Sequence, residues 1–306
     1  MKRRGRRYWL NLLGFTLGLW ALLLAGGTLW FTYARTMAYI HPARQAATGQ
    51  WLRQAGVQYE EVTLSTEDGL RLRAWYTAPR NGAVILVAHG HGASIPEEYY
   101  ILFAQHGYGV LAWDFRAHGE SEGDRSTLGY NEAMDIKAAL DFALAQPGVR
   151  HVGAWGNSMG AAAIIHAAAK YPEIEAVVAD SAYATLREVM EMRVPSPMLR
   201  PLVRLIGLMN TRVDLEWMRP EEDIGRISPR AVFIIQGLAD AAIPTDSAER
   251  LYRAAGEPRF LWVEEGVGHV GMYLNFRESY TERVIDFLDE ALLGAPFQTY
   301  QNRTTD

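Results

Sequence analysis

An apolar run that ends in a Gly-x-Ser-x-Gly turn and passes directly into an alanine-rich run constrains this chain most. The segment is 152–163, VGAWGNSMGAAA, with Ser158 at the centre of the turn. A strand–turn–helix unit of this kind holds a serine hydroxyl exposed on a sharp bend. Gly156 and Gly160 have a steric reason to be glycine, because side chains there would collide with neighbouring backbone. The amides that open the following helix favour negative charge beside the serine. The segment therefore predicts a serine poised for nucleophilic attack.

Apolar runs and helical patterns alternate on both sides of this unit. Two alternating runs with Asp68-Gly69 between them predict an antiparallel hairpin, and continuous apolar runs predict strands covered on both faces. The predicted strands are 59–65, 70–76, 83–88, 109–113, the run before Ser158, 176–179, 231–236 and 260–263. One predicted helix ends at about residue 105. The other predicted helices span 131–145, 161–171, 247–255 and 280–292. The sequence thus predicts an α/β fold with a mostly parallel sheet, helices on both faces, and a ligand site beyond the carboxyl ends of the strands.

The segment 181–229 interrupts this alternation. It is long, contains five prolines, and mixes Met and Leu with charged residues. Two interpretations stay open, a pair of amphipathic helices packed on the sheet or a small helical cap over the site. Long insertions at the ligand end of a sheet are often functional, so we expect the cap.

The N-terminus carries a long uncharged stretch. Residues 8–34 contain no charged residue over 27 consecutive positions, with aromatic residues at both ends. About 20 apolar residues cross a bilayer as a helix, so we expect a transmembrane helix. Five basic residues crowd the first seven positions, which predicts a cytoplasmic N-terminus and an extracytoplasmic catalytic domain. The alternative is a signal peptide cleaved near Ala25-Gly26-Gly27, but the apolar stretch is longer than such segments usually are.

Composition excludes several classes of chemistry. The chain has no cysteine, so it forms no disulfide, thiolate metal site or cysteine nucleophile. Without the first seven positions it carries 25 Lys and Arg against 35 Asp and Glu, which argues against nucleic-acid binding. Two pairs of residues have a spacing that suggests a metal site, His89 with His91 and Asp114 with His118. The predicted fold already accounts for both pairs. We expect neither a metal nor a cofactor.

Two loops supply the partners that a serine nucleophile needs. A serine hydroxyl requires a general base within hydrogen-bond reach and a carboxylate that orients this base. Asp240 directly follows the strand 231–236, and His269 follows the strand 260–263. Asp246 is a second candidate for the carboxylate, but Asp240 lies closer to the end of its strand. We therefore expect the order Ser158, Asp240, His269 along the chain.

These motifs resemble the α/β-hydrolase superfamily from about residue 59 to 293. The resemblance is carried by HGHG at 89–92, DFRAHGES at 114–121, GNSMG at 156–160, GLADAAIP at 237–244 and GHVGMY at 268–273. Within the superfamily the chain is similar to membrane-anchored bacterial esterases and to monoacylglycerol-lipase-like and aminopeptidase-like groups. The resemblance implies that Ser158 is the nucleophile, His269 the general acid and base, and Asp240 the orienting carboxylate. It also implies an oxyanion hole made of the backbone amides of His91 and Met159.

The expected organisation is a basic tip and transmembrane helix at 1–36, a juxtamembrane connector at 37–58, and a hydrolase domain at 59–306 with its cap at about 181–229. The expected activity is hydrolysis of an ester or thioester of a small-to-medium acyl group through an acyl-enzyme. The expected partners are a small-molecule acyl ester or lipid-like substrate and the membrane. A serine peptidase or amidase with the same triad and a non-catalytic hydrolase scaffold are the alternatives.

Overall fold

A single sheet of eight strands forms the centre of the protein. The computed structural model describes residues 2–194 and 196–294. The strands run in the order β1-β2-β4-β3-β5-β6-β7-β8, with β1, β2 and β4 antiparallel neighbours and the others parallel. Their bounds are Glu60–Ser65 (β1), Arg71–Thr77 (β2), Ala83–Ala88 (β3), Gly109–Trp113 (β4), His151–Asn157 (β5), Ala176–Asp180 (β6), Ala231–Gly237 (β7) and Arg259–Glu264 (β8). The predicted α/β fold, with a mostly parallel sheet entered by a hairpin, is confirmed.

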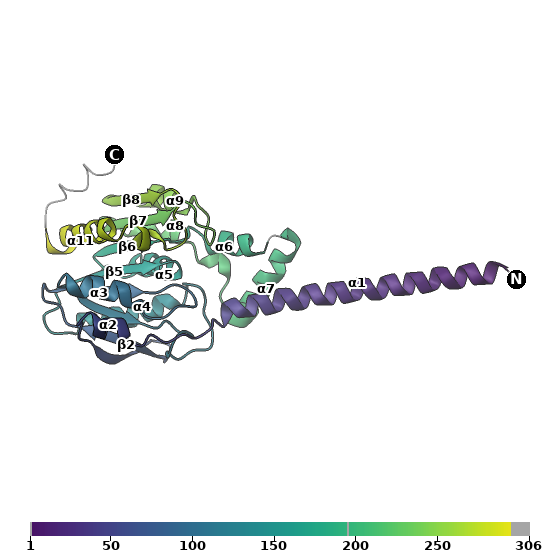
Figure 1. Ribbon diagram of the computed structural model, residues 1–306, viewed down its shortest axis with the longest axis horizontal. Helices are drawn as coiled ribbons and strands as arrows, with labels where there is room; N and C mark the ends of the chain where they lie inside the picture. The colour runs from purple at the N-terminus through teal and green to yellow at the C-terminus, as the bar shows by residue number, and fades with distance from the viewer. Residues whose placement is uncertain (1, 195, 295–306) are drawn as a thin grey trace.

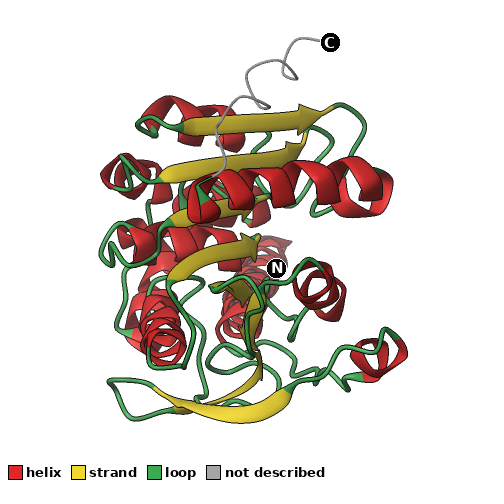
Figure 2. Ribbon diagram, turned by 90° about the vertical axis from the view of Figure 1, so that its left-hand side faces the viewer, coloured by secondary structure: helices red, strands yellow, loops and turns green. Residues whose placement is uncertain are grey.

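Helices cover both faces of the sheet, as Figure 2 shows. Every residue of β3, β4, β6 and β7 is buried, because strands enclosed by two layers of helices have no face toward water. One face packs against α4 (Glu132–Leu144), α5 (Met159–Ala168) and α9 (Ser247–Ala254). The other packs against α3 (Glu97–Gln105) and α11 (Arg277–Leu293). The carboxyl ends of the parallel strands therefore remain open for a site.

The N-terminal helix α1 (Lys2–Ile40) leaves the domain as one long rod (Figure 1). Among the described residues, its segment Arg7–Ile40 is the one helix long and apolar enough to cross a membrane, and its most apolar window packs against nothing else in the chain. The helix extends beyond the predicted end at residue 36 and enters the hydrolase domain. There the carbonyl of Ile40 accepts a hydrogen bond from the amide of Ser126 at 2.7 Å.

The predicted connector is packed against the domain. The short helix α2 (Gln50–Gln54) buries Leu52 completely. The carboxylate of Glu97 accepts hydrogen bonds from four backbone amides, those of Thr48, Gly49, Trp51 and Leu52, at 2.8 to 3.4 Å. One buried side chain on α3 thus fixes the chain between α1 and the sheet.

The segment between β6 and β7 is helical. It contains α6 (Leu186–Arg193), the 3₁₀ helix η1 (Pro197–Leu199), α7 (Arg200–Thr211), η2 (Leu215–Trp217), α8 (Pro220–Asp223) and η3 (Ile224–Arg226). The elements α6 and α7 project from the domain, and α7 packs on the C-terminal part of α1 (Figure 1). A further short helix, α10 (Met272–Asn275), follows the loop after β8.

Candidate active site

Ser158 lies on a strained turn between β5 and α5. Its backbone has φ 52° and ψ −120°, a conformation that a residue other than glycine rarely adopts. A Cβ atom on Gly156 would lie 2.7 Å from the carbonyl carbon of Gly160, and one on Gly160 would lie 2.4 Å from the carbonyl oxygen of Ala88. The steric requirement for both glycines is confirmed, because α5 begins directly against the turn and against β3.

The structure brings the three candidate side chains together. Nε2 of His269 is 2.9 Å from Oγ of Ser158, and Nδ1 of His269 is 2.6 Å from Oδ2 of Asp240. The other oxygen of Asp240 accepts hydrogen bonds from the amides of Ala242 and Ile243 at 2.7 and 3.1 Å. With both oxygens occupied, this buried carboxylate holds the imidazole in one orientation. A serine hydroxyl in this arrangement can lose its proton to His269 as it attacks.

The second candidate carboxylate lies away from this cluster. Asp246 precedes α9, and its Oδ2 atom is 4.0 Å from a guanidinium nitrogen of Arg250. More than half of its side chain is exposed. It makes a surface ion pair, so the geometry favours Asp240.

Two backbone amides are the candidate oxyanion donors, those of His91 and Met159, and both residues line the pocket that Ser158 lines. The amide of Met159 opens α5, so it has no carbonyl partner four residues earlier within the helix. His91 lies in the turn after β3, and this turn is braced by His89. Nε2 of His89 accepts a hydrogen bond from the amide of Phe115, and Nδ1 donates to the carbonyl of Gly90. Burial lowers the pKa of His89 to about 3, so the ring stays neutral and holds the loop without adding charge.

The sequence did not point to a contribution from the end of α1. The carbonyl of Tyr39 accepts a hydrogen bond from Nε2 of His91 at 2.8 Å, and the two rings lie 5.8 Å apart. The hydroxyl of Tyr39 accepts a hydrogen bond from Arg193 of α6 at 3.0 Å. Burial lowers the pKa of His91, which keeps its ring neutral. The end of the N-terminal helix therefore contacts His91 and lines the same pocket as the serine, and a tyrosine among apolar residues carries no sequence signal for this.

A small pocket of about 50 Å³ opens beside Ser158. Its walls come from the end of α1, the turn after β3, and the face of α6 that points toward the sheet. The lining residues are Tyr39, His91, Leu128, Ser158, Met159, Tyr183, Leu186, Val189, Met190, Arg193 and Ile243. Residues of α6, in the segment where we expect the cap, thus form part of the wall beside the serine.

A buried network connects the serine turn to the histidine loop. The amide of Ser158 donates to the carbonyl of Asp180 at 2.9 Å, and the amide of Val270, next to His269, donates to Oγ of Ser181 at 3.1 Å. The Asp180 carboxylate accepts hydrogen bonds from the hydroxyls of Ser181 and Tyr280, both at 2.9 Å. Burial raises the pKa of Asp180 to about 6. These side chains neither cap a helix nor line the pocket; they fix the spacing between nucleophile and base.

The part of the chain that the structure describes contains no cluster of side chains that could hold a metal ion. No three His, Asp or Glu residues there lie close enough to hold an ion. The Asp114 carboxylate accepts hydrogen bonds from the hydroxyl of Ser94 and from the amides of Ile95 and Glu120. Asp114 therefore ties the loop after β4 to the segment between β3 and α3.

The sequence and the fold match known hydrolases. The profile of the family described as serine aminopeptidase, S33, matches residues 79–225. The uncharacterized protein Rv2307c of Mycobacterium tuberculosis is 30% identical over 282 residues, which cover 89% of this chain and 94% of that protein. The uncharacterized membrane protein YNL320W of Saccharomyces cerevisiae is 24% identical over 243 residues, covering 77% and 81% of the two chains.

Among solved structures, the Pyrococcus furiosus esterase Pf2001 superposes with a TM-score of 0.68 at 24% identity, covering 82% of this chain and 99% of the esterase. Such a similarity shows that the fold is shared. Together with the relatives and the matched family profile, it shows the superfamily to which the chain belongs. The protein is a hydrolase and belongs to the α/β-hydrolase superfamily.

Proposed function

We propose that the protein is a serine hydrolase that cleaves esters or thioesters of small-to-medium acyl groups. The observation that carries this proposal is the chain of contacts from Ser158 through His269 to Asp240, at 2.9 and 2.6 Å. No cofactor takes part in this chemistry. The reaction requires a nucleophile, a proton carrier and an oxyanion site, and the chain has candidates for each.

In the proposed first half-reaction, Oγ of Ser158 attacks the substrate carbonyl carbon while Nε2 of His269 takes the hydroxyl proton. The carbonyl oxygen becomes an oxyanion and accepts hydrogen bonds from the amides of His91 and Met159. The bond to the leaving group then breaks, and His269 passes its proton to the departing oxygen or sulfur. Ser158 is left as an acyl ester, and Asp240 stabilises the imidazolium that forms between these steps.

In the second half-reaction, His269 takes a proton from water, whose oxygen attacks the acyl carbon. The tetrahedral intermediate collapses, Oγ of Ser158 regains the proton from His269, and the carboxylic acid leaves. Each removed oxyanion donor costs about 10²–10³ in kcat in enzymes of this kind. We therefore expect the backbone amides of His91 and Met159 to contribute substantially to kcat.

Peptide or amide cleavage is the second candidate, and the matched aminopeptidase profile supports it. The pocket supports the ester instead. Among the described residues that line it, none is Asp or Glu, and one is Arg193. An aminopeptidase must bind a free, positively charged amino group, which needs a carboxylate when it leaves water. We therefore place the ester first.

We further propose that α1 anchors the protein in a membrane with the N-terminus in the cytoplasm and the hydrolase domain outside. The length and composition of α1 support the anchor, as does the yeast relative, which is named as a membrane protein. The basic residues at positions 2–7 support the orientation. We expect the full-length protein to stay in the membrane pellet after a carbonate wash. A soluble form beginning near Thr28 would instead indicate a cleaved signal peptide.

The activity is tested with p-nitrophenyl esters from acetate to palmitate, using the full-length protein and its Ser158→Ala variant in the same lipid environment. We expect turnover that depends on Ser158. Folded protein without turnover on any ester would refute the esterase. Cleavage of aminoacyl anilides would then favour the peptidase, and inactivity on both would favour the non-catalytic scaffold.

A further inference from the structure

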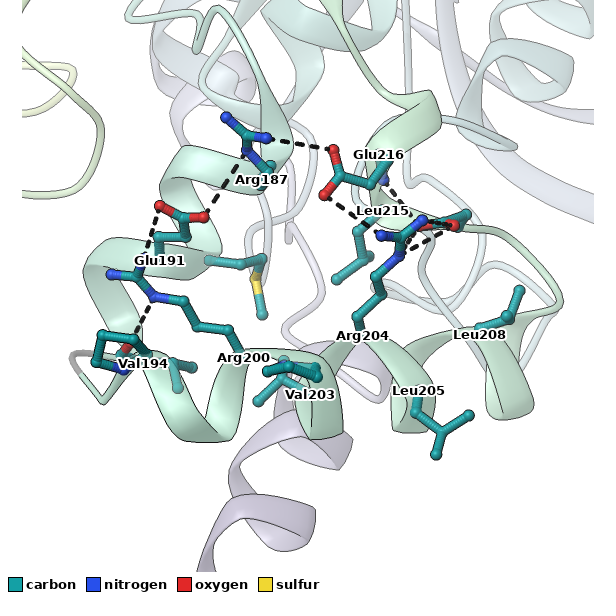
Figure 3. A pocket seen from close by; sticks show the side chains of 14 residues that line it. Arg187, Glu191, Val194, Arg200, Val203, Arg204, Leu205, Leu208, Leu215 and Glu216 are labelled. Carbon is teal, nitrogen blue, oxygen red and sulfur yellow. Dashed lines mark hydrogen bonds and ion pairs between the residues drawn. The ribbon is translucent and has the colours of Figure 1, made fainter.

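A second and larger cavity, of about 620 Å³, lies in the cap between α6, α7 and η2 (Figure 3). Ligand sites in proteins usually have volumes of about 300–1,000 Å³. Met190, Val194, Val203, Leu208 and Leu215 give it an apolar lining. The cavity is thus large enough for a ligand and suits a hydrocarbon.

The charged side chains around this cavity neutralise one another. Arg187 and Arg200 pair with Glu191 at 3.8 and 3.1 Å, and Arg204 pairs with Asp214 at 2.5 Å. Glu216 lies within 3.9 Å of two of these arginines. Figure 3 shows these pairs around the apolar side chains. Since each of these charges already has a partner, the cavity offers no unpaired charge to a polar ligand, and an uncharged chain fits it best.

The helix α6 is the wall between this cavity and the pocket at Ser158. Leu186, Val189 and Arg193 line the serine pocket, whereas the neighbouring stripe of the helix lines the cap cavity. Met190 lines both and is only 7% exposed. Methionine has three rotatable bonds and adapts its shape readily. Met190 is therefore an adaptable side chain at the shared boundary of the two spaces.

The volumes of the two spaces favour a connection between them for longer substrates. The pocket at Ser158 has a volume of about 50 Å³, well below the about 300–1,000 Å³ of most ligand sites. His269 is not among the residues that line this pocket, and a leaving group must lie beside His269 to receive its proton. The pocket therefore suits the acyl part of an ester, and the large apolar space for a longer acyl chain lies past Met190.

We propose that the cap cavity binds the acyl chain of the substrate, with the ester carbonyl at Ser158 and Met190 as the side chain that the acyl chain displaces. This assignment rests on the proposed esterase activity and names its substrate class as medium-chain acyl esters. The helix α7, which forms one side of the cavity, also packs on α1, and Figure 3 shows α1 directly beneath α7. The proposed acyl-chain site thus lies next to α1, the helix that is long and apolar enough to cross a membrane.

The test compares kcat/KM for p-nitrophenyl octanoate and acetate in the full-length protein reconstituted in lipid nanodiscs. The Met190→Ala variant removes the partition, so the octanoate-to-acetate ratio should rise by about tenfold, within the range that one side chain in an apolar pocket controls. Leu208 lines the cavity and is partly exposed, so a tryptophan fits there and fills part of the cavity. In the Leu208→Trp variant the octanoate-to-acetate ratio should therefore fall by a similar factor.

Met192→Ala is the matched control, because Met192 is also on α6 but lines neither space. It should leave the ratio unchanged. If all three proteins hydrolyse the acetate ester and the octanoate-to-acetate ratio is the same in wild type, Met190→Ala and Leu208→Trp, the proposed acyl-chain site is wrong. The proposed esterase activity would still stand. Absence of Ser158-dependent turnover on every ester would overturn the proposed esterase and the chain site with it.

Discussion

Replacing the Asp240 carboxylate with an amide tests the role of a single oxygen atom. In the native structure Oδ2 faces Nδ1 of His269 at 2.6 Å, while Oδ1 accepts hydrogen bonds from the amides of Ala242 and Ile243. In the Asp240→Asn variant the amide oxygen keeps these backbone bonds, so the amide nitrogen must face the imidazole. A donor at that position leaves the imidazole proton on Nε2, where the ring cannot accept the proton of Ser158.

The expected loss is large in kcat and small in stability. An amide in place of the orienting carboxylate of a serine triad lowers kcat by about 10⁴-fold, which corresponds to about 5 kcal/mol of transition-state stabilisation. KM should change little, because Asp240 does not line the pocket at Ser158. Initial rates on p-nitrophenyl acetate, with thermal unfolding measured on the same samples, separate catalysis from folding.

Asp246→Asn is the matched control. Asp246 is the other aspartate of this loop, and its exposed side chain faces Arg250 instead of His269. We expect wild-type kcat within about twofold, as for most surface substitutions. The reasoning fails if Asp240→Asn keeps more than about a tenth of kcat, or if Asp246→Asn loses as much.

Four further predictions follow from the packing around the site. Tyr39→Ala should raise KM for short esters by about tenfold, because it removes one wall of the pocket, whereas Tyr39→Phe keeps the ring and should change KM by less than about threefold. Both variants keep the backbone carbonyl that binds His91. Equal KM values in both variants would contradict a role for the ring. Because burial raises the pKa of Asp180 from 3.8 to about 6, its contribution to stability is complete below pH 3.8 and is lost as the pH rises through about 6. The free energy of unfolding of the wild type, measured in urea relative to Asp180→Asn, should therefore fall by up to about 3 kcal/mol as the pH rises across this window. A rise in this free energy would contradict the assignment. Glu97→Ala should expose the segment 48–52 to proteolysis and cost about 2–4 kcal/mol, since four backbone amides lose their acceptor; Glu97→Gln should cost less, and an uncleaved segment in Glu97→Ala would refute this anchoring role. Gly160→Ala should prevent folding or destabilise the protein by more than about 3 kcal/mol, because its Cβ would meet the Ala88 carbonyl at 2.4 Å; a stable Gly160→Ala protein would show that the turn can relax.

The sequence predicted the sheet well because its central strands are buried on both faces. Such strands must be continuous apolar runs, and turn residues mark their ends. The strands 83–88 and 109–113 match the structure residue for residue. The helix predicted at 161–171 begins two residues earlier, at Met159, because the serine turn passes into it without a linker.

The three candidate side chains could be predicted for a topological reason. Each follows the carboxyl end of a strand, and a parallel sheet gathers these ends at one edge. Tyr39 and Met190 could not be predicted in this way. Their positions depend on how α1 and α6 dock onto the sheet edge, and neither helix carries a pattern that fixes its docking. The network beneath Ser158 depends likewise on the side chain of Tyr280, a residue 100 positions from Asp180.

Labelling of the full-length protein with a fluorophosphonate probe tests the central claim most directly. The probe forms a covalent bond only with a serine whose hydroxyl is activated, so it reports on Ser158 without any assumption about the substrate. We expect mass spectrometry to find one modified peptide, the one that contains Ser158, and we expect labelling and ester turnover to vanish together in Ser158→Ala. Folded protein that the probe leaves unmodified, or ester turnover that persists in Ser158→Ala, would contradict the account.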